Sequence, residues 1–315
     1  MIPVVKGVDH VIIRTENPAR LFYFFTQVLK LPVAWQLSTD RYICTGGVFL
    51  GNACLEIISY NQTASGGESK SSLFGIAFEP YDFSQALQEL TRRDFPHSCP
   101  IPYRGSLKPF RDDFAFNTSP LPSNLGWTMS LLGGLLEGST PSYYLGKHIS
   151  TNKFILNLYG RILERFSQLP AGAGYINRVL GFSTFSLIEY PHDTHQLKLQ
   201  RRVELSISKG GVLGILDLAE IDIGVRNFAT KKERWQALLN PLAAVSDGVW
   251  RLEDGVSLRL TPHRADRLVS LSLRVADLSQ AGKILDKNGW LGAEKKDRLS
   301  LSPSIVDGLS IELTA

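Results

Sequence analysis

The chain has 315 residues, of which 43% are hydrophobic and 20% charged, and its formal net charge is +4. This length predicts one to three domains with ample material for a large core. Lysine and arginine are scattered rather than gathered into a basic stripe, which argues against a nucleic-acid partner. No apolar run reaches the roughly 20 residues that span a bilayer, so we expect no membrane partner.

The cysteine content and the N-terminus both favour a cytoplasmic protein. Cys44, Cys54 and Cys99 are odd in number and contain no CxxC pair, so neither a disulfide framework nor a zinc knuckle is expected. The N-terminus lacks the apolar stretch and the cleavage site of a signal peptide. The absence of GxGxxG, GxxxxGK[ST], GxSxG and HExxH motifs argues against nucleotide-binding proteins, serine hydrolases and zincins.

The first sixty residues predict a β-α-β-β-β unit. Residues 8–15 are rich in β-branched side chains and predict a strand. Asn17 is a suitable helix cap before Pro18, and apolar positions at helical spacing predict a helix over residues 18–30. Three further strands are expected at 33–38, 42–50 and 53–60.

The same order begins again after a Gly/Ser-rich linker at residues 61–72. A strand is expected at 73–79 and a helix at 82–93, followed by a Pro-rich excursion at 96–125 of the kind that often covers a binding site. The closing strands of this unit are expected at 127–132 and 142–148, and the bridge to the second half comprises a helix at 153–168 and a hairpin of 181–190 with 196–208.

Two more units follow the bridge. Asn227 is the expected cap of the helix in the third unit, matching Asn17 in the first. The expected elements of the third unit are a strand from Leu216, a helix at 228–240 and strands at 248–252 and 256–261; those of the fourth are a strand from Arg267, a helix at 277–288 and strands at 297–301 and 309–314. A repeat of about fifty residues therefore predicts an α+β fold of four βαβββ modules in two pairs.

The domain organisation expected from these repeats has three parts. Residues 1–150 form a module pair with the active site, residues 151–212 form a helical bridge and hairpin, and residues 213–315 form a second module pair.

His10 in the first strand and Glu56 in the last strand of the first unit are the leading candidate site residues. Both side-chain types bind divalent metals well. Alternation along a strand places His10 on the same face as Val8, Ile12 and Arg14. A carboxylate between apolar strand neighbours is costly to bury unless it is paired or bound to metal, so Glu56 either binds an ion or hydrogen-bonds to His10.

Two segment pairs resemble the vicinal oxygen chelate superfamily, the glyoxalase, bleomycin-resistance and extradiol dioxygenase fold. They are GVDHVIIRTENPARLFYFFTQVL followed by ACLEII, and LVSLSLRVADLSQAGKIL followed by DGLSIELT. The resemblance implies that each module pair forms a curved mixed sheet around a concave cavity. It also implies that metal ligands come from the first and last strands of the modules in a pair.

Transferred by position, the resemblance gives an incomplete ligand set in the first half. His10 and Glu56 match, whereas Gly75 and Gly146 fall at the corresponding positions of the second module and cannot bind. His148 lies two residues after Gly146, at the end of a segment that resembles a glyoxalase-like closing strand. His10, Glu56 and His148 would together hold Fe(II), Mn(II) or Zn(II).

The second half departs further from the ligand pattern. In the third module, Glu220 falls at the His10 position and Arg259 at the Glu56 position. In the fourth module, Ser270 falls at the first-strand ligand position, and only Glu312, on the last strand, matches the ligand pattern. Glu220 and Arg259 are expected to form an ion pair across the sheet in place of a metal. We interpret this half as a degenerate copy that serves either the structure of the chain or formation of a homodimer.

The resemblance implies a metal-dependent enzyme of lyase, isomerase or dioxygenase type that acts on a small organic substrate through two adjacent oxygens. Two alternatives stay open: a metal-free protein that binds small molecules, and a metal-free isomerase or cyclase with Glu56 as general base. Arg14 is the expected contact for an anionic substrate group. Other residues expected to contact the substrate are aromatic, namely Phe116, Trp127 and Tyr144.

A second group of polar residues follows the strand expected at 181–190. His192, Asp193 and His195 lie in the segment PHDTH, which we interpret as a solvated turn.

Overall fold

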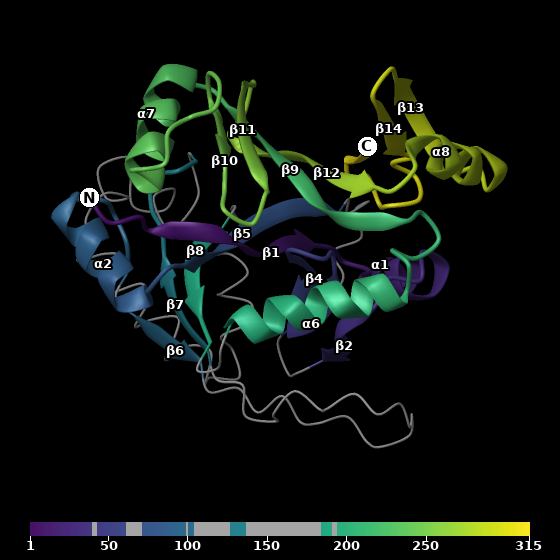
Figure 1. Cartoon of the computed structure of the whole chain (residues 1–315), viewed down its shortest axis with the longest axis horizontal. Helices are drawn as coiled ribbons and strands as arrows, with labels where there is room; N and C mark the ends of the chain where they lie inside the picture. The colour runs from purple at the N-terminus through teal and green to yellow at the C-terminus, as the bar shows by residue number, and fades with distance from the viewer. Residues whose placement is uncertain (40–42, 61–70, 99, 104–126, 137–183, 191–193) are drawn as a thin grey trace.

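The computed structural model describes residues 1–39, 43–60, 71–98, 100–103, 127–136, 184–190 and 194–315. Two mixed β-sheets and a few helices form the described part of the chain, as Figure 1 shows. Residues 5–189 contain all strands of one sheet and residues 215–314 all strands of the other. The predicted α+β fold of repeated modules in two halves is therefore confirmed.

The first sheet has eight strands in the order β2-β3-β4-β1-β5-β8-β7-β6. β1 lies at its centre, parallel to β4 and antiparallel to β5, and β5 is in turn parallel to β8. The strands are β1 (Val5–Arg14), β2 (Val33–Thr39), β3 (Ile43–Phe49), β4 (Cys54–Tyr60), β5 (Ser72–Pro80), β6 (Ile101–Tyr103), β7 (Trp127–Leu131) and β8 (Thr184–Glu189).

The second sheet has seven strands in the order β10-β11-β9-β12-β15-β14-β13. Its central pair β9 and β12 is antiparallel, and each of these strands is parallel to the last strand of its own module, as in the first sheet. The strands are β9 (Ile215–Val225), β10 (Val249–Arg251), β11 (Ser257–Pro262), β12 (Arg267–Val275), β13 (Leu291–Lys295), β14 (Arg298–Leu301) and β15 (Ile311–Thr314).

Each module has a helix after its first strand. They are α1 (Pro18–Tyr23), which continues as a π-helical turn at Phe24–Val28, α2 (Phe83–Arg92), α7 (Phe228–Leu239) and α8 (Leu278–Lys287). Side chains of Asn17, Asp82 and Asp277 accept a hydrogen bond from the first turn of their helices. Asn227 precedes α7 as expected, but its side chain makes no capping bond. Among the described helices, none is long and apolar enough to cross a bilayer.

The predicted bridge differs most from the structure. The hairpin expected from residues 181–190 and 196–208 is wrong, because its second arm is a helix, α6 (Thr194–Ile207). Its first arm, β8, lies in the first sheet beside β5. The bridge therefore supplies a strand and a helix to the first half, while the helix expected at 153–168 lies outside the described residues.

The third module has only two strands after its helix. Between α7 and β12 the only strands are β10 and β11, at the two places where strands were expected, and this stretch is described without a gap, so the module is βαββ rather than βαβββ. The second sheet consequently lacks a counterpart of β2. The fourth module gains β13, which pairs with β14 and which the sequence pattern did not predict.

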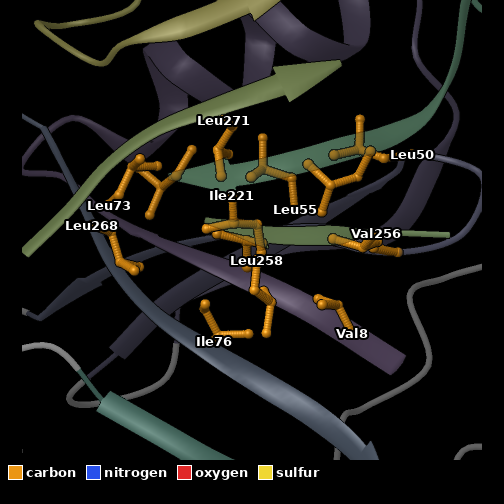
Figure 2. Close-up of a cluster of buried hydrophobic side chains, with 14 of the residues drawn as sticks. Val8, Leu50, Leu55, Leu73, Ile76, Ile221, Val256, Leu258, Leu268 and Leu271 are labelled. Carbon is orange, nitrogen blue, oxygen red and sulfur yellow. The ribbon is translucent and has the colours of Figure 1, made fainter. Parts of the chain in front are cut away.

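One face of each sheet packs against the other sheet in a shared apolar core. Figure 2 shows side chains of the two sheets facing one another: Val8, Leu55, Leu73 and Ile76 from the first, and Ile221, Leu258, Leu268 and Leu271 from the second. Helices extend this core, since Trp235 of α7 makes edge contacts with Phe78 and Phe185 at ring distances of 6.2 and 5.5 Å. The opposite face of the first sheet carries His10 and Glu56.

Candidate functional site

The first sheet brings His10 and Glu56 into contact, as the sequence predicted. β1 and β4 run parallel with His10 beside Cys54 and Ile12 beside Glu56, so the two polar side chains are diagonal neighbours on one face. His10 Nε2 lies 3.2 Å from Glu56 Oε2. The Glu56 side chain is 20% exposed and that of His10 11%, so Glu56 is the member of this Glu56–His10 pair that a ligand reaches more easily.

An irregularity in β1 adds Asp9 to the site. Val8 pairs with Phe78 and His10 with Ala77, so Asp9 is an extra residue in the ladder with β5. Asp9 therefore lies beside His10, with its Oδ2 atom 2.7 Å from His10 Nδ1. Val8 lies on the opposite face in the shared core, so its predicted place on the His10 face is wrong.

The carboxylate of Asp9 is buried with three donors. Arg201 of α6 donates from Nη2 to Asp9 Oδ1 at 2.8 Å, and the hydroxyl of Tyr190 donates to Oδ2 at 2.9 Å. Burial disfavours the charged carboxylate, but Arg201 and His10 outweigh this effect and lower the pKa of Asp9 well below its usual range. Burial also raises the pKa of Tyr190, so its hydroxyl stays neutral and donates.

His10 is held in its charged form between two carboxylates. Burial disfavours the imidazolium, but hydrogen bonds with Asp9 and Glu56 and the charges of both outweigh it and raise the pKa of His10 to about 9. At neutral pH both ring nitrogens therefore carry protons, with Nδ1 donating to Asp9 and Nε2 to Glu56. Cys54, the strand neighbour of His10, has its pKa raised to about 12 by burial and remains a neutral thiol.

The other oxygen of Glu56 is fixed by β3 and β2. Thr45 donates from Oγ1 to Glu56 Oε1 at 2.9 Å, and the Trp35 indole donates from Nε1 to the same hydroxyl oxygen at 3.3 Å. Gly47 allows this arrangement, because a Cβ atom there would lie 2.4 Å from the Trp35 ring. The side chains that flank Glu56 thus include one flat aromatic surface.

The strand registers identify which residues of the second module occupy the ligand positions. His10 pairs with Cys54, and Glu56 lies two residues further along β4. Gly75 pairs with Thr184, so the counterpart of Glu56 is Ser186 on β8. The predicted counterpart, Gly146, was assigned to a strand at 142–148 that lies outside the described residues, and β8 occupies the place beside β5.

The described residues therefore do not supply a complete metal site. Of the four ligand positions, two carry His10 and Glu56, whereas Gly75 has no side chain and Ser186 offers only a hydroxyl. Within the described part of the chain, no group of three or more His, Cys, Asp or Glu side chains is placed to hold an ion. His148 lies outside that part, so its role as a third ligand stays a prediction.

The remaining predicted site residues are only partly placed. Arg14 lies on β1 with its guanidinium 5.8 Å from the centre of the Phe74 ring. Trp127 begins β7 and pairs through its backbone with Tyr103, but the position of its side chain is outside the description, as are Phe116 and Tyr144. His192 and Asp193 also lie outside, and His195 belongs to α6 rather than to a turn.

The equivalent face of the second sheet carries an ion network instead of ligands. Arg259 donates to Glu220 at 2.6 Å, which confirms the predicted ion pair. Arg298 of β14 also donates to Glu220, at 3.1 Å, and to Glu312 at 3.1 Å. A guanidinium group thus connects the counterpart of His10 with the one matching carboxylate of the second half.

Replacing Arg298 by methionine is expected to lower the free energy of unfolding by about 1–3 kcal/mol, because two partly buried carboxylates each lose a donor. Arg274→Met is the matched control: its partner Asp217 is more exposed, so the loss should stay below about 1 kcal/mol. Urea denaturation of both variants measures the difference. Equal losses would show that Arg298 stabilises no more than a surface ion pair.

No family model and no curated protein matches the sequence. Solved structures do share its fold. A hypothetical protein from Staphylococcus aureus aligns at 10% identity with a TM-score of 0.54, covering 97% of this chain and 98% of that one. The 2,3-dioxygenase LapB from Pseudomonas sp. KL28 aligns at 11% identity with a TM-score of 0.53, covering 100% and 93%.

A further similar structure is a homoprotocatechuate 2,3-dioxygenase from Brevibacterium fuscum in complex with 3,4-dihydroxyphenylacetate. It aligns at 10% identity with a TM-score of 0.51, covering 100% of this chain and 81% of that one. At such identities the likeness shows the fold alone. The chain shares the fold of these 2,3-dioxygenases, and the α+β arrangement of repeated modules is the one that its residue pattern predicted.

Proposed function

We propose that the chain is an enzyme that moves protons on a small organic substrate at the Glu56–His10 pair, as an isomerase or lyase without a resident metal. The observation that carries the proposal is the pair itself: a partly exposed carboxylate lies 3.2 Å from a buried imidazolium on the face away from the shared core. The carboxylate offers a proton acceptor and the imidazolium a proton donor to the same substrate, which are the two functions of general acid–base chemistry.

The proposed reaction is removal of a proton from a carbon next to a carbonyl group. Glu56 accepts the proton, the C–H bond breaks, its electron pair forms a C=C bond, and the π electrons of the carbonyl group move onto the oxygen to give an enolate. The adjacent charge of His10 stabilises that anion, as preorganised donors do in other enzymes. Return of the proton to a different atom completes an isomerisation. Arg14, on the same strand face as His10, is proposed to bind an anionic group of the substrate.

A second candidate retains the metal. The contact of Asp9 with His10 Nδ1 at 2.7 Å favours it, because a histidine that binds a metal usually donates its other ring proton to a carboxylate. This candidate requires a third ligand, and we propose His148. The ion would be Fe(II), Mn(II) or Zn(II).

Solvent deuterium exchange tests the first candidate without knowledge of the product. In D2O, the protein is expected to exchange C–H protons next to the carbonyl in some members of a panel of small hydroxyketones and dicarbonyls, as seen by NMR. Glu56→Gln should lower the rate by about 100-fold or more. Glu312→Gln, which changes a carboxylate on the last strand of the fourth module, should leave it unchanged.

Metal content separates the candidates. Exchange that survives chelation, with no metal in freshly purified protein, supports the first candidate. Exchange lost on chelation and restored by one divalent ion per chain supports the second. Binding of panel compounds in a thermal-shift assay without any exchange would instead support the metal-free binding protein and overturn both enzyme candidates.

A further inference from the structure

Helix α6 contacts Asp9, the neighbour of His10, through Arg201, which lies 192 residues further along the chain. Arg201 lies on its inner side and is 6% exposed, and Leu205, one turn further, approaches Gly51 between β3 and β4. The helix packs against β3 and β9 (Figure 1). The helix therefore places a buried cation against the strand that carries His10.

Arg201 holds both the side chain and the backbone of the extra residue in β1. Its Nη2 atom donates to Asp9 Oδ1 at 2.8 Å, and its Nη1 atom donates to the Asp9 carbonyl oxygen at 3.2 Å. Two donors on one planar guanidinium group fix both the distance and the orientation of the residue that accepts their hydrogen bonds. The orientation of the Asp9 carboxylate is thus set from α6.

The orientation of Asp9 in turn sets that of the His10 ring. Arg201 occupies Oδ1, which leaves Oδ2 for His10 Nδ1 at 2.7 Å and for the Tyr190 hydroxyl at 2.9 Å. With Nδ1 bound to Asp9, the ring is held so that Nε2 faces Glu56. An ion pair that only stabilised the fold would not require one carboxylate oxygen to bind the cation and the other to bind the imidazole.

We propose that Arg201 is a positioning residue: through Asp9, it holds the His10 ring in the rotamer that turns Nε2 toward Glu56. The inference rests on the proposed function only in treating the Glu56–His10 pair as the reaction centre. Lys198, one turn earlier on α6, provides a matched comparison, because its carboxylate partners are Glu79 and Asp254, neither of which contacts His10 among the described interactions.

Histidine NMR tests the inference. The protein has six histidines, and the ring signals of His10 are assigned from their absence in His10→Gln. In the unmodified protein, a downfield Nδ1–H proton signal of His10 is expected from its bond to Asp9. Arg201→Met should abolish this signal, Arg201→Lys should restore it in part, and Lys198→Met should leave it in place.

Asp9→Asn should abolish the same signal, which covers the case in which Arg201→Met folds poorly. An unchanged His10 signal in Arg201→Met, or its equal loss in Lys198→Met, would overturn the inference. The readout does not depend on turnover. If the His10 signal follows Arg201 but no panel compound exchanges deuterium, the positioning role stands and the proposed function fails.

Discussion

Arg201→Met is expected to lower the free energy of unfolding by about 3–5 kcal/mol, because it leaves the buried carboxylate of Asp9 without its strongest cationic partner. The loss of two hydrogen bonds to Asp9 adds to the loss of charge compensation. Urea denaturation monitored by tryptophan fluorescence measures the effect.

A double-mutant cycle distinguishes this cause from loss of packing by the long arginine side chain. Asp9→Asn removes the charge that Arg201 compensates, so Arg201→Met should cost much less in the Asp9→Asn background than in the unmodified protein. Simple addition of the two losses would contradict the assigned ion pair.

The contribution of His10 to stability is expected to disappear at high pH. Its folded-state pKa of about 9 lies above the ordinary value of 6.5, so the folded protein binds the proton more tightly than the unfolded chain. The stabilisation is therefore complete below about pH 6.5 and is lost as the pH rises through 9. Its size is on the order of 3 kcal/mol.

The measurement is the difference in unfolding free energy between the unmodified protein and His10→Gln from pH 6 to pH 10. The other groups that face His10 allow a clean comparison, because Asp9 has a strongly lowered pKa and the pKa values of Cys54 and Tyr190 are raised by burial. A difference that stays constant or grows with pH would show that His10 is not held as an imidazolium.

The sequence predicted most of the modules because their signals are local. Helix starts at Asn17, Asp82 and Asp277 and alternating strands place the elements within a few residues of their observed bounds. The extra residue at Asp9 has no such signal: strict alternation points it away from His10, and only the paired strand shows the irregularity. The strongest contact of His10 was therefore invisible in the sequence.

Helix α6 was mistaken for a strand although its apolar residues recur at helical spacing, and these residues lie on the side that stays exposed. Leu199, Val203 and Ile207 are 48%, 55% and 71% exposed, whereas Arg201 on the opposite side is buried. Such a helix shows no apolar stripe on the side that packs. The buried side of the helix carries Lys198, Arg201 and Leu205, which are three and then four residues apart, as on one face of a helix. This spacing indicates a packed face only when the buried carboxylates that pair with the two cations are known.

The ion network of the second sheet was half predictable. Glu220 and Arg259 follow from matching the repeats position by position. The part played by Arg298 does not follow from the repeats, because its strand carries none of the four ligand positions. The pairing of β14 with β15 brings Arg298 beside these carboxylates. Contacts that depend on register between distant strands are set by the assembled sheet and not by local sequence.

The apolar core that the two sheets share affects how the chain acquires its structure during synthesis. The first sheet emerges from the ribosome with one face still uncovered, since its partners Ile221, Leu258 and Leu271 follow much later in the sequence. Nascent chains that expose such a face are prone to aggregate and to engage chaperones. The second half, whose ligand positions have changed, covers the back of the sheet that holds the Glu56–His10 pair, so we expect it to protect the chain from aggregation once it has been synthesised.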